Sequence, residues 1–175
     1  MNHNKILYLV HAAVIAAVYV ILTMLAASFN LASGAIQVRF SEVLTILPYF
    51  TPAAVPGVVI GCLLSNILTG CALPDIIFGT FATLLGALGT YALRKNRWLA
   101  PIPPIVANML IVPLVLRYAY HIPGALWFLM ATVGAGEVIS CYLFGEVLLG
   151  ALLPFRQKIF GSAETISRKP GAVAR

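Results

Sequence analysis

Long runs without a charged side chain constrain this sequence more than any other feature. Residues 6–27 contain no Asp, Glu, Lys or Arg, and equally uncharged runs cover 76–93, 98–116 and 118–136. A helix needs about 20 apolar residues to cross a hydrocarbon core about 30 Å thick. Only 9% of the 175 residues are charged, whereas about a quarter are charged in an ordinary soluble domain. The sequence therefore predicts an all-α integral membrane protein.

The number of helices depends on the run 43–74, which contains PYFTPAAVPG at 48–57. Its three prolines and its glycine interrupt any continuous helix. We therefore expect a short helix, too short to span comfortably, then a turn and a second helix. The prediction is a compact bundle of six transmembrane helices in residues 1–155, followed by a basic, flexible cytoplasmic tail in 156–175. The expected helices are 6–27, about 37–49, about 54–70, 76–93, 98–116, and 118–136 with an apolar continuation to about 153.

The basic residues predict the orientation of this bundle. Nine of the eleven fall on the side that holds both termini, and cytoplasmic loops carry the excess of Lys and Arg. Both termini are therefore expected in the cytoplasm, and the net charge of +6 needs no nucleic-acid partner to explain it. The nine residues are Lys5, Arg94, Lys95, Arg97, Arg156, Lys158, Arg168, Lys169 and Arg175.

Polar residues within the apolar runs are the candidate binding groups. An ionisable side chain inside a helix bundle is costly, so it usually faces the interior and has a partner. Glu137 has no basic residue near it in sequence and follows small residues, which favours a ligand contact. Arg39 and Glu42 instead have the spacing of an intrahelical pair. The asparagines Asn66 and Asn108 fit either a ligand contact or a hydrogen bond between helices.

Other polar and small residues have simpler interpretations. Asp75 follows Leu-Pro and precedes an apolar helix, as an N-cap does, and Glu146 reads as a snorkelling or interface residue. The three cysteines lack metal-ligand spacing, so we expect no metal site. Two kinds of small-residue spacing favour close helix packing. These are the alanine pairs Ala12/Ala16 and Ala13/Ala17, and the motif Gly57-Val-Val-Ile-Gly61.

Five segments in order resemble the QueT-like queuosine-precursor transporter family, substrate-binding S components of energy-coupling factor transporters. They are VRFSEVLTILPYF at 38–50, GCLLSNIL at 61–68, DIIFGTFATLLGAL at 75–88, NMLIVPLVL at 108–116 and GEVISCYLFGEVLL at 136–149. The resemblance implies a subunit in a prokaryotic cytoplasmic membrane that binds a 7-deazaguanine at the outer face. Its partners would be a transmembrane coupling protein and two cytoplasmic ATPases. The sequence contains no Walker motif. From the resemblance we expect that the chain has no cofactor and no enzymatic activity of its own.

The resemblance also implies roles for particular residues. The alanine strip Ala12, Ala13, Ala16 and Ala17 resembles the surface that the family presents to the coupling protein. A deazaguanine offers two adjacent donors to a carboxylate, a carbonyl to an amide and a ring to an aromatic face. An aminomethyl group would add a cation for a second carboxylate. The expected substrate-binding residues are Glu137, Glu42, Asn108, Asn66, Arg39, Tyr142 and Trp127, although Trp127 fits an interfacial anchor equally well.

Two other function classes stay open at this stage. An S component for a vitamin or another small metabolite would share the architecture and the energy source. A secondary carrier would take up its substrate without ATP or coupling proteins. An intramembrane enzyme is disfavoured because no nucleophile, metal set or acid–base pair falls at matching depth.

Overall fold

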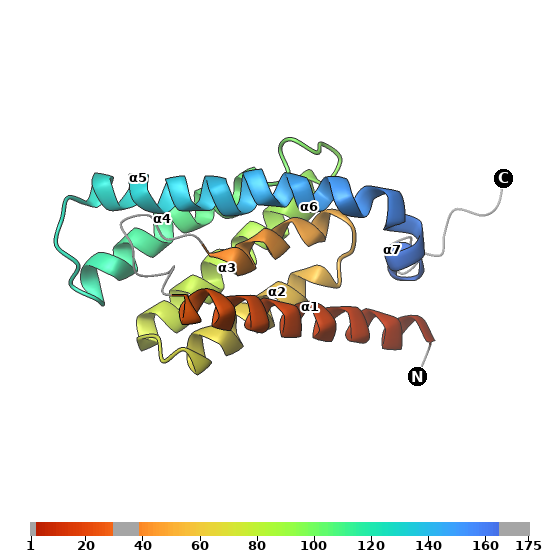
Figure 1. Cartoon of the computed structure of the whole chain (residues 1–175), viewed down its shortest axis with the longest axis horizontal. Coiled ribbons are helices and arrows are strands. Elements are labelled where there is room, and N and C mark those ends of the chain that lie inside the picture. Colours follow the sequence, from red (N-terminus) through yellow and green to blue (C-terminus); the bar gives the residue numbers. More distant parts are fainter. Residues whose placement is uncertain (1–2, 30–38, 165–175) are drawn as a thin grey trace.

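The computed structural model describes residues 3–29 and 39–164, and these residues form helices without any strand (Figure 1). The all-helical prediction is confirmed. The elements are α1 (His3–Ser28), the 3₁₀ helix η1 (Phe40–Tyr49), α2 (Ala54–Leu68), α3 (Leu73–Leu93), α4 (Ile102–Tyr118), α5 (Leu126–Glu137), the π-helix η2 (Val138–Phe144), α6 (Gly145–Leu152), η3 (Leu153–Phe155) and α7 (Arg156–Glu164).

Three segments are long and apolar enough to cross a membrane, namely Lys5–Ser28, Leu73–Leu93 and Leu126–Gly161. The last runs without a break through α5, η2 and α6 along one side of the molecule (Figure 1). The helices α2 and α4 are shorter but apolar. The protein is thus a helical membrane protein, while six crossings and cytoplasmic termini stay predictions.

The last long helix begins at Leu126 rather than at residue 118, where the sequence placed it. The chain turns between α4 and α5 because His121 has a φ of 52° and Gly124 a φ of 135°, backbone conformations that no helix contains. Pro123 lies between them and further disfavours a helix. An absence of charge therefore does not distinguish helix from turn in this run. The sequence His-Ile-Pro-Gly at 121–124 is the local signal for the turn.

The short helix η1 is the centre of the fold. Its ten residues rise about 2 Å each, which falls short of a bilayer core about 30 Å thick. It contacts α1, α2, α3, η2 and α6, and Ile46 and Leu47 lie in the main hydrophobic core. The helix is short and packed among other helices, in line with the expectation that it is too short to span comfortably, while its depth in a membrane stays a prediction.

Helices α1 and α2 pack closely through the two glycines of α2. A Cβ on Gly61 would lie 2.6 Å from Cβ of Tyr19, and one on Gly57 would lie 2.9 Å from Cβ of Ile15. No side chain fits at such distances, so these positions need glycine. The motif therefore serves packing within the chain, as its spacing indicated.

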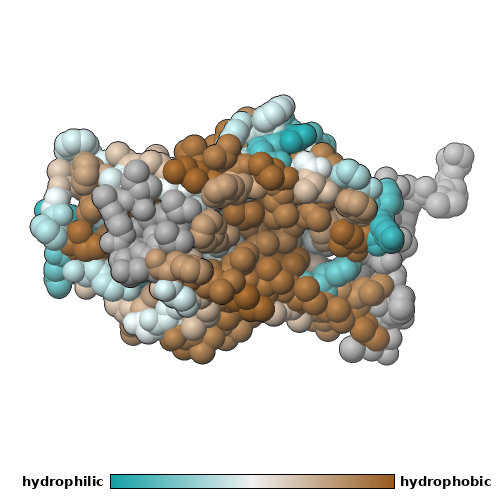
Figure 2. All heavy atoms as spheres, in the orientation of Figure 1, coloured by the Kyte–Doolittle hydropathy of each residue, from teal (hydrophilic) through white to brown (hydrophobic). Residues whose placement is uncertain are grey.

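The outer surface is that of a protein in lipid. In Figure 2, brown apolar residues cover the middle of the visible face, and teal hydrophilic residues lie toward both ends of the long axis and in a patch along the top edge. Large apolar side chains such as Leu9, Ile21, Ile77 and Val147 are more than half exposed. This arrangement matches an apolar belt that faces acyl chains between two polar ends.

The beginning of α1 and helix α7 lie side by side at one end of the molecule (Figure 1). The ring of Phe160 stacks on Phe50 with 5.2 Å between centroids, and it is buried. The first part of the expected flexible tail is therefore a packed helix, α7. Residues 165–175 lie outside the described part of the chain.

Candidate functional site

Glu42 lies on η1 with no solvent exposure. The Tyr19 hydroxyl of α1 donates a hydrogen bond of 2.6 Å to Glu42 Oε1. The other oxygen, Oε2, has no hydrogen-bond partner. Glu42 is buried because η1, the helix that carries it, packs against α1, α2, α3, η2 and α6.

Glu137 approaches Glu42 from the long helix. The Cys141 thiol donates to Glu137 Oε2 over 3.1 Å, and the ligating atoms of Glu42, Glu137 and Cys141 all lie within 4.8 Å of one another. Asn108 of α4 is buried near both carboxyl groups, but its Nδ2 is not within hydrogen-bond geometry of either. The structure thus brings together three residues that the sequence analysis selected from separate helices.

The π-helix η2 begins directly after Glu137. A π-helix widens the helical turn, and such segments are frequent at functional sites. Here the widened turn carries Ser140 and Cys141, both buried, and the Cys141 thiol contacts Glu137. In a regular α-helix, the side chains of Ser140 and Cys141 would point in different directions relative to that of Glu137.

Three buried polar atoms around this cluster lack partners: Glu42 Oε2, Asn108 Nδ2 and Ser140 Oγ. A buried group without a hydrogen bond costs about 1–3 kcal/mol. Proteins rarely leave several such atoms together, and each needs an explanation. We call Glu42, Asn108, Glu137, Ser140 and Cys141 the acidic cluster, and its unpaired donor and acceptors are groups that a ligand can meet.

A cavity of about 160 Å³ adjoins the acidic cluster at the end of the bundle where α1 and α2 end. Tyr19 lines this cavity and also donates to Glu42, so it joins the two regions. Asn66 and Arg39 line it as well, and the Asn66 amide donates weakly to the Cys62 thiol over 3.6 Å. The other lining residues are Thr23, Ala26, Ala27, Ser41, Ser65, Thr69 and Cys71.

Arg39 and Glu42 do not form the ion pair that their spacing suggested. Within the described residues the ion pair joins Arg97 and Glu146 instead. The Arg39 guanidinium carries its charge in the neighbourhood of Asp75, Glu42 and Glu137 without an ion pair to any of them among the described residues. Glu42 therefore takes its hydrogen bond from Tyr19 and keeps one oxygen free.

Asp75 is not the N-cap of α3, which is Ala72. Proline at the second helical position moved the helix start upstream, since its fixed φ suits the first turn. Asp75 accepts a hydrogen bond of 2.9 Å from the Tyr120 hydroxyl, which in turn accepts one of 3.0 Å from the Ala72 N–H. Partial burial and the Asp75 carboxylate raise the pKa of Tyr120, so its hydroxyl stays a donor.

The two aromatic residues named from the sequence stand apart from the acidic cluster. Trp127 is 72% exposed and packs edge-on against Phe128, as an interfacial anchor would. Tyr142 is partly buried on η2, and within the described residues no hydrogen bond joins its side chain to Glu42, Asn108 or Glu137. The aromatic residue at the site is Tyr19, which sequence reasoning missed because its partner Glu42 lies 23 residues away.

The four alanines of α1 divide into two faces. Ala12 and Ala16 are buried, with their backbone carbonyls against Gly57 and Gly61 of α2. Ala13 and Ala17 are exposed. A partner can therefore reach only the second pair, and the expected four-residue strip is halved.

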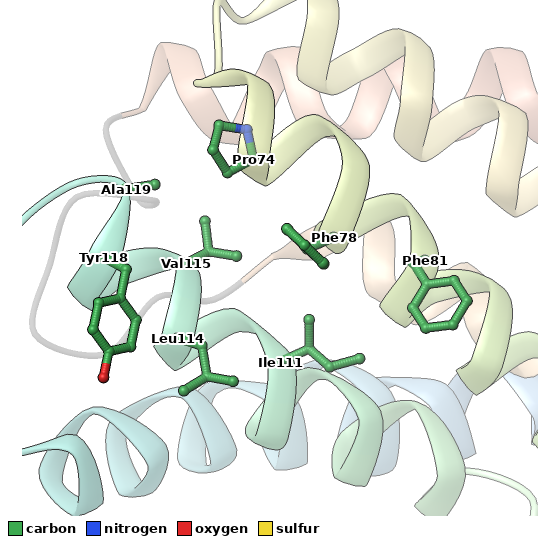
Figure 3. Close-up of a pocket in the computed structure, with 8 residues that line it drawn as sticks. All are labelled: Pro74, Phe78, Phe81, Ile111, Leu114, Val115, Tyr118 and Ala119. Carbon is green, nitrogen blue, oxygen red and sulfur yellow. The ribbon is translucent and has the colours of Figure 1, made fainter.

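A larger groove of about 530 Å³ lies between α3 and α4. Figure 3 shows its apolar lining from both helices, with the Tyr118 hydroxyl directed away from it. The groove contains none of the polar groups that recognise a hydrophilic metabolite, so we place the candidate site at the smaller cavity. Its lining is Pro74, Phe78, Phe81, Ile111, Leu114, Val115, Tyr118 and Ala119.

The acidic cluster also has the donor types of a metal site. The Cys141 sulfur, however, donates its proton to Glu137 in this arrangement, whereas a metal ligand is a thiolate. The Asn108 amide N–H without a partner is likewise a group that metals do not use. The set suits an organic ligand that has donors and an acceptor.

Comparison with known proteins gives a family for the chain. The model described as "QueT transporter" matches residues 9–154. A protein of Lactococcus lactis subsp. cremoris named "Queuosine precursor transporter QueT" is 38% identical over 85 residues, which are 49% of this chain and 50% of that protein. The match thus spans about half the length of this relative. No solved structure matches the chain.

Proposed function

The chain belongs to the QueT transporter family, and on that premise we propose that it captures a 7-deazaguanine precursor of queuosine as the substrate-binding subunit of an energy-coupling factor importer. The printed name of the Lactococcus relative supports the substrate class. The observation that carries the proposal is the group of partnerless buried atoms at Glu42, Asn108 and Ser140.

The chemistry of a deazaguanine complements these atoms. Its ring N–H and exocyclic amine are adjacent donors, which suit the oxygens of one carboxylate, and its carbonyl accepts from an amide N–H such as Asn108 Nδ2. Ligand binding would then satisfy groups that cost free energy in the empty protein. The same groups reject an apolar molecule of equal size, because they would stay buried and unpaired.

The second carboxylate gives the site a further preference. Glu42 and Glu137 lie together, and two like charges at this distance repel unless a proton or a cation lies between them. The amine of an aminomethyl-deazaguanine is such a cation. In this proposal the ligand approaches the cluster through the cavity lined by Tyr19, Arg39 and Asn66. The volume of this cavity, about 160 Å³, is smaller than the roughly 300–1,000 Å³ of sites for drug-sized molecules.

The energy for uptake comes from partner subunits in this proposal. A transmembrane coupling protein and two cytoplasmic ATPases would supply it, with both termini of this chain in the cytoplasm. The exposed Ala13 and Ala17 on α1 offer a flat strip where a helix of the coupling protein can approach closely.

Calorimetric titration of the purified chain tests the proposal. We expect tight binding of aminomethyl-deazaguanine or queuine without ATP or partners, and no binding of riboflavin or biotin. Binding of a vitamin in their place would contradict the substrate and leave another S component. Uptake by vesicles that contain this chain alone, driven by an ion gradient, would contradict the subunit role and favour a secondary carrier.

A further inference from the structure

Glu42 and Glu137 are two buried carboxyl groups that lie close together. The residues are 0% and 4% exposed, and a carboxyl oxygen of one lies within 4.8 Å of a carboxyl oxygen of the other. Two carboxylates at this separation repel each other where water is excluded, and one member of such a pair keeps its proton. The pair therefore holds a single negative charge unless a positive group balances the second.

The hydrogen-bond donors that reach this pair are neutral. The Tyr19 hydroxyl of α1 donates to Glu42 Oε1 over 2.6 Å, and the Cys141 thiol of η2 donates to Glu137 Oε2 over 3.1 Å. Phenol and thiol groups are uncharged at neutral pH, and so is the buried thiol of Cys62 on α2. The two donors stabilise a carboxylate through hydrogen bonds, but none of the three groups balances a second charge.

The charged groups nearby do not balance two carboxylates either. Arg39 lines the adjoining cavity, and within the described residues it forms no ion pair with either carboxyl group. Asp75, in the first turn of α3, adds a third buried carboxyl group, while Glu146 of α6 is already paired with Arg97. One guanidinium is too few for three carboxyl groups, and Asn108 of α4 brings no charge. An unbalanced charge in the protein interior is costly, so a proton on the pair is favoured.

Resting on the function proposed above, we infer that Glu42 and Glu137 share one proton in the empty protein and release it when the cationic amine of the substrate binds between them. One positive charge leaves the pair as a proton and one enters as the ammonium group, so the net charge of the site does not change. Tyr19 both lines the cavity and bonds Glu42, which gives the proton a route toward the cavity. A deazaguanine without the amine leaves the proton in place.

Calorimetric titration in two buffers of equal pH and different ionisation enthalpy counts the released protons. With aminomethyl-deazaguanine we expect release of about one proton per ligand bound, because the bound cation replaces it. The matched ligand is 7-deazaguanine, which lacks the amine and is expected to release almost none. Binding of the aminomethyl compound without proton release, or equal release with both ligands, would overturn the inference.

Infrared spectroscopy tests the shared proton without any ligand. A protonated carboxyl group has a C=O stretching band that a carboxylate lacks, and the chain has five acidic residues to which such a band can belong. In a detergent without ester groups we expect the band in the natural chain and in Glu146→Gln. We expect its loss in Glu42→Gln and in Glu137→Gln, because Arg39 can balance the one carboxylate that remains. A band missing from the natural chain, or equally strong in all four proteins, would contradict the shared proton.

Failure of this inference and failure of the proposed function give different results. If the natural chain binds neither ligand, the proposed function is wrong, and the infrared band still decides whether the pair holds a proton. If the chain binds both ligands and releases no proton with either, the function stands and the exchange is wrong. A band that persists after the aminomethyl compound has bound would contradict the exchange in the same way.

Discussion

Two arginine and glutamate couples lie near opposite ends of α3 and differ in their bonding. Arg97, just after α3, pairs with Glu146 of α6 over 2.6 Å, with side chains 38% and 11% exposed. Arg39, just before η1, makes no ion pair with Glu42, whose side chain is 0% exposed and keeps Oε2 without a partner. Each glutamate keeps one buried oxygen without a partner, Oε1 of Glu146 and Oε2 of Glu42, but the other oxygen is bound by an arginine only in Glu146 and by the Tyr19 hydroxyl in Glu42.

That difference separates a structural ion pair from a binding site. A partly exposed pair contributes little and needs no further explanation. A buried carboxylate that keeps a free oxygen beside an available arginine loses stability, and such a loss persists where function requires it. The comparison also separates the roles of Glu146 and Glu137, which lie nine residues apart on one long helix.

The largest expected effect is on the buried carboxylates. Glu42→Gln or Glu137→Gln replaces an acceptor-only group with an amide that presents its own donor to the ligand, so we expect a loss of about 2–4 kcal/mol in binding free energy, or about 30- to 1,000-fold in Kd. Calorimetric titration measures it. Glu146→Gln is the matched control and is expected to bind normally. Equal losses of affinity in all three variants would contradict the claim that Glu42 and Glu137 bind the ligand and Glu146 does not.

A second effect reaches Glu42 from α2. A Cβ at Gly61 would lie 2.6 Å from the Tyr19 Cβ, so Gly61→Ala forces Tyr19 away from Glu42. We expect the variant to lose about 1–3 kcal/mol of stability. Thermal unfolding in detergent measures it, with Gly150→Ala as the control, because the nearest atom there would be 3.6 Å away. If both variants unfolded alike, the close packing of α1 on α2 would be refuted.

A third effect has opposite signs for stability and binding. Asn108→Leu removes a buried amide N–H that has no partner in the described protein. We expect stability to be unchanged or to rise by about 1 kcal/mol, while binding of a deazaguanine weakens. Parallel unfolding and titration experiments measure the two quantities. A clear loss of stability would mean that the amide already has a partner.

The smallest effect belongs to the paired couple. Arg97→Gln removes an ion pair whose arginine is more than one third exposed, so we expect a stability loss of less than about 1 kcal/mol. Substrate affinity is expected to stay the same. A large loss of affinity would show that the two ends of the bundle are coupled, and the comparison would then need a mechanism that links them.

The sequence predicted the helices because apolar runs and proline breaks are local signals. It also selected Glu42, Asn108 and Glu137, because an ionisable or amide group stands out in an apolar run. It missed Tyr19, because an aromatic residue in an apolar helix looks like any lipid-facing or core residue. It misjudged Asp75, because the bond from Tyr120 joins residues 45 apart in sequence. Contacts between distant segments depend on packing, which no local pattern contains.

The central claim is that the free oxygen of Glu42 belongs to the substrate. The most direct test is the shift in unfolding free energy on adding aminomethyl-deazaguanine to the natural chain, Glu42→Gln and Glu146→Gln. At a ligand concentration of about 100 times the Kd of the natural chain, that chain and Glu146→Gln are expected to gain about 2.7 kcal/mol, whereas Glu42→Gln, with its weaker binding, is expected to gain about 0.9 kcal/mol or less. An equal gain in all three proteins would contradict the claim.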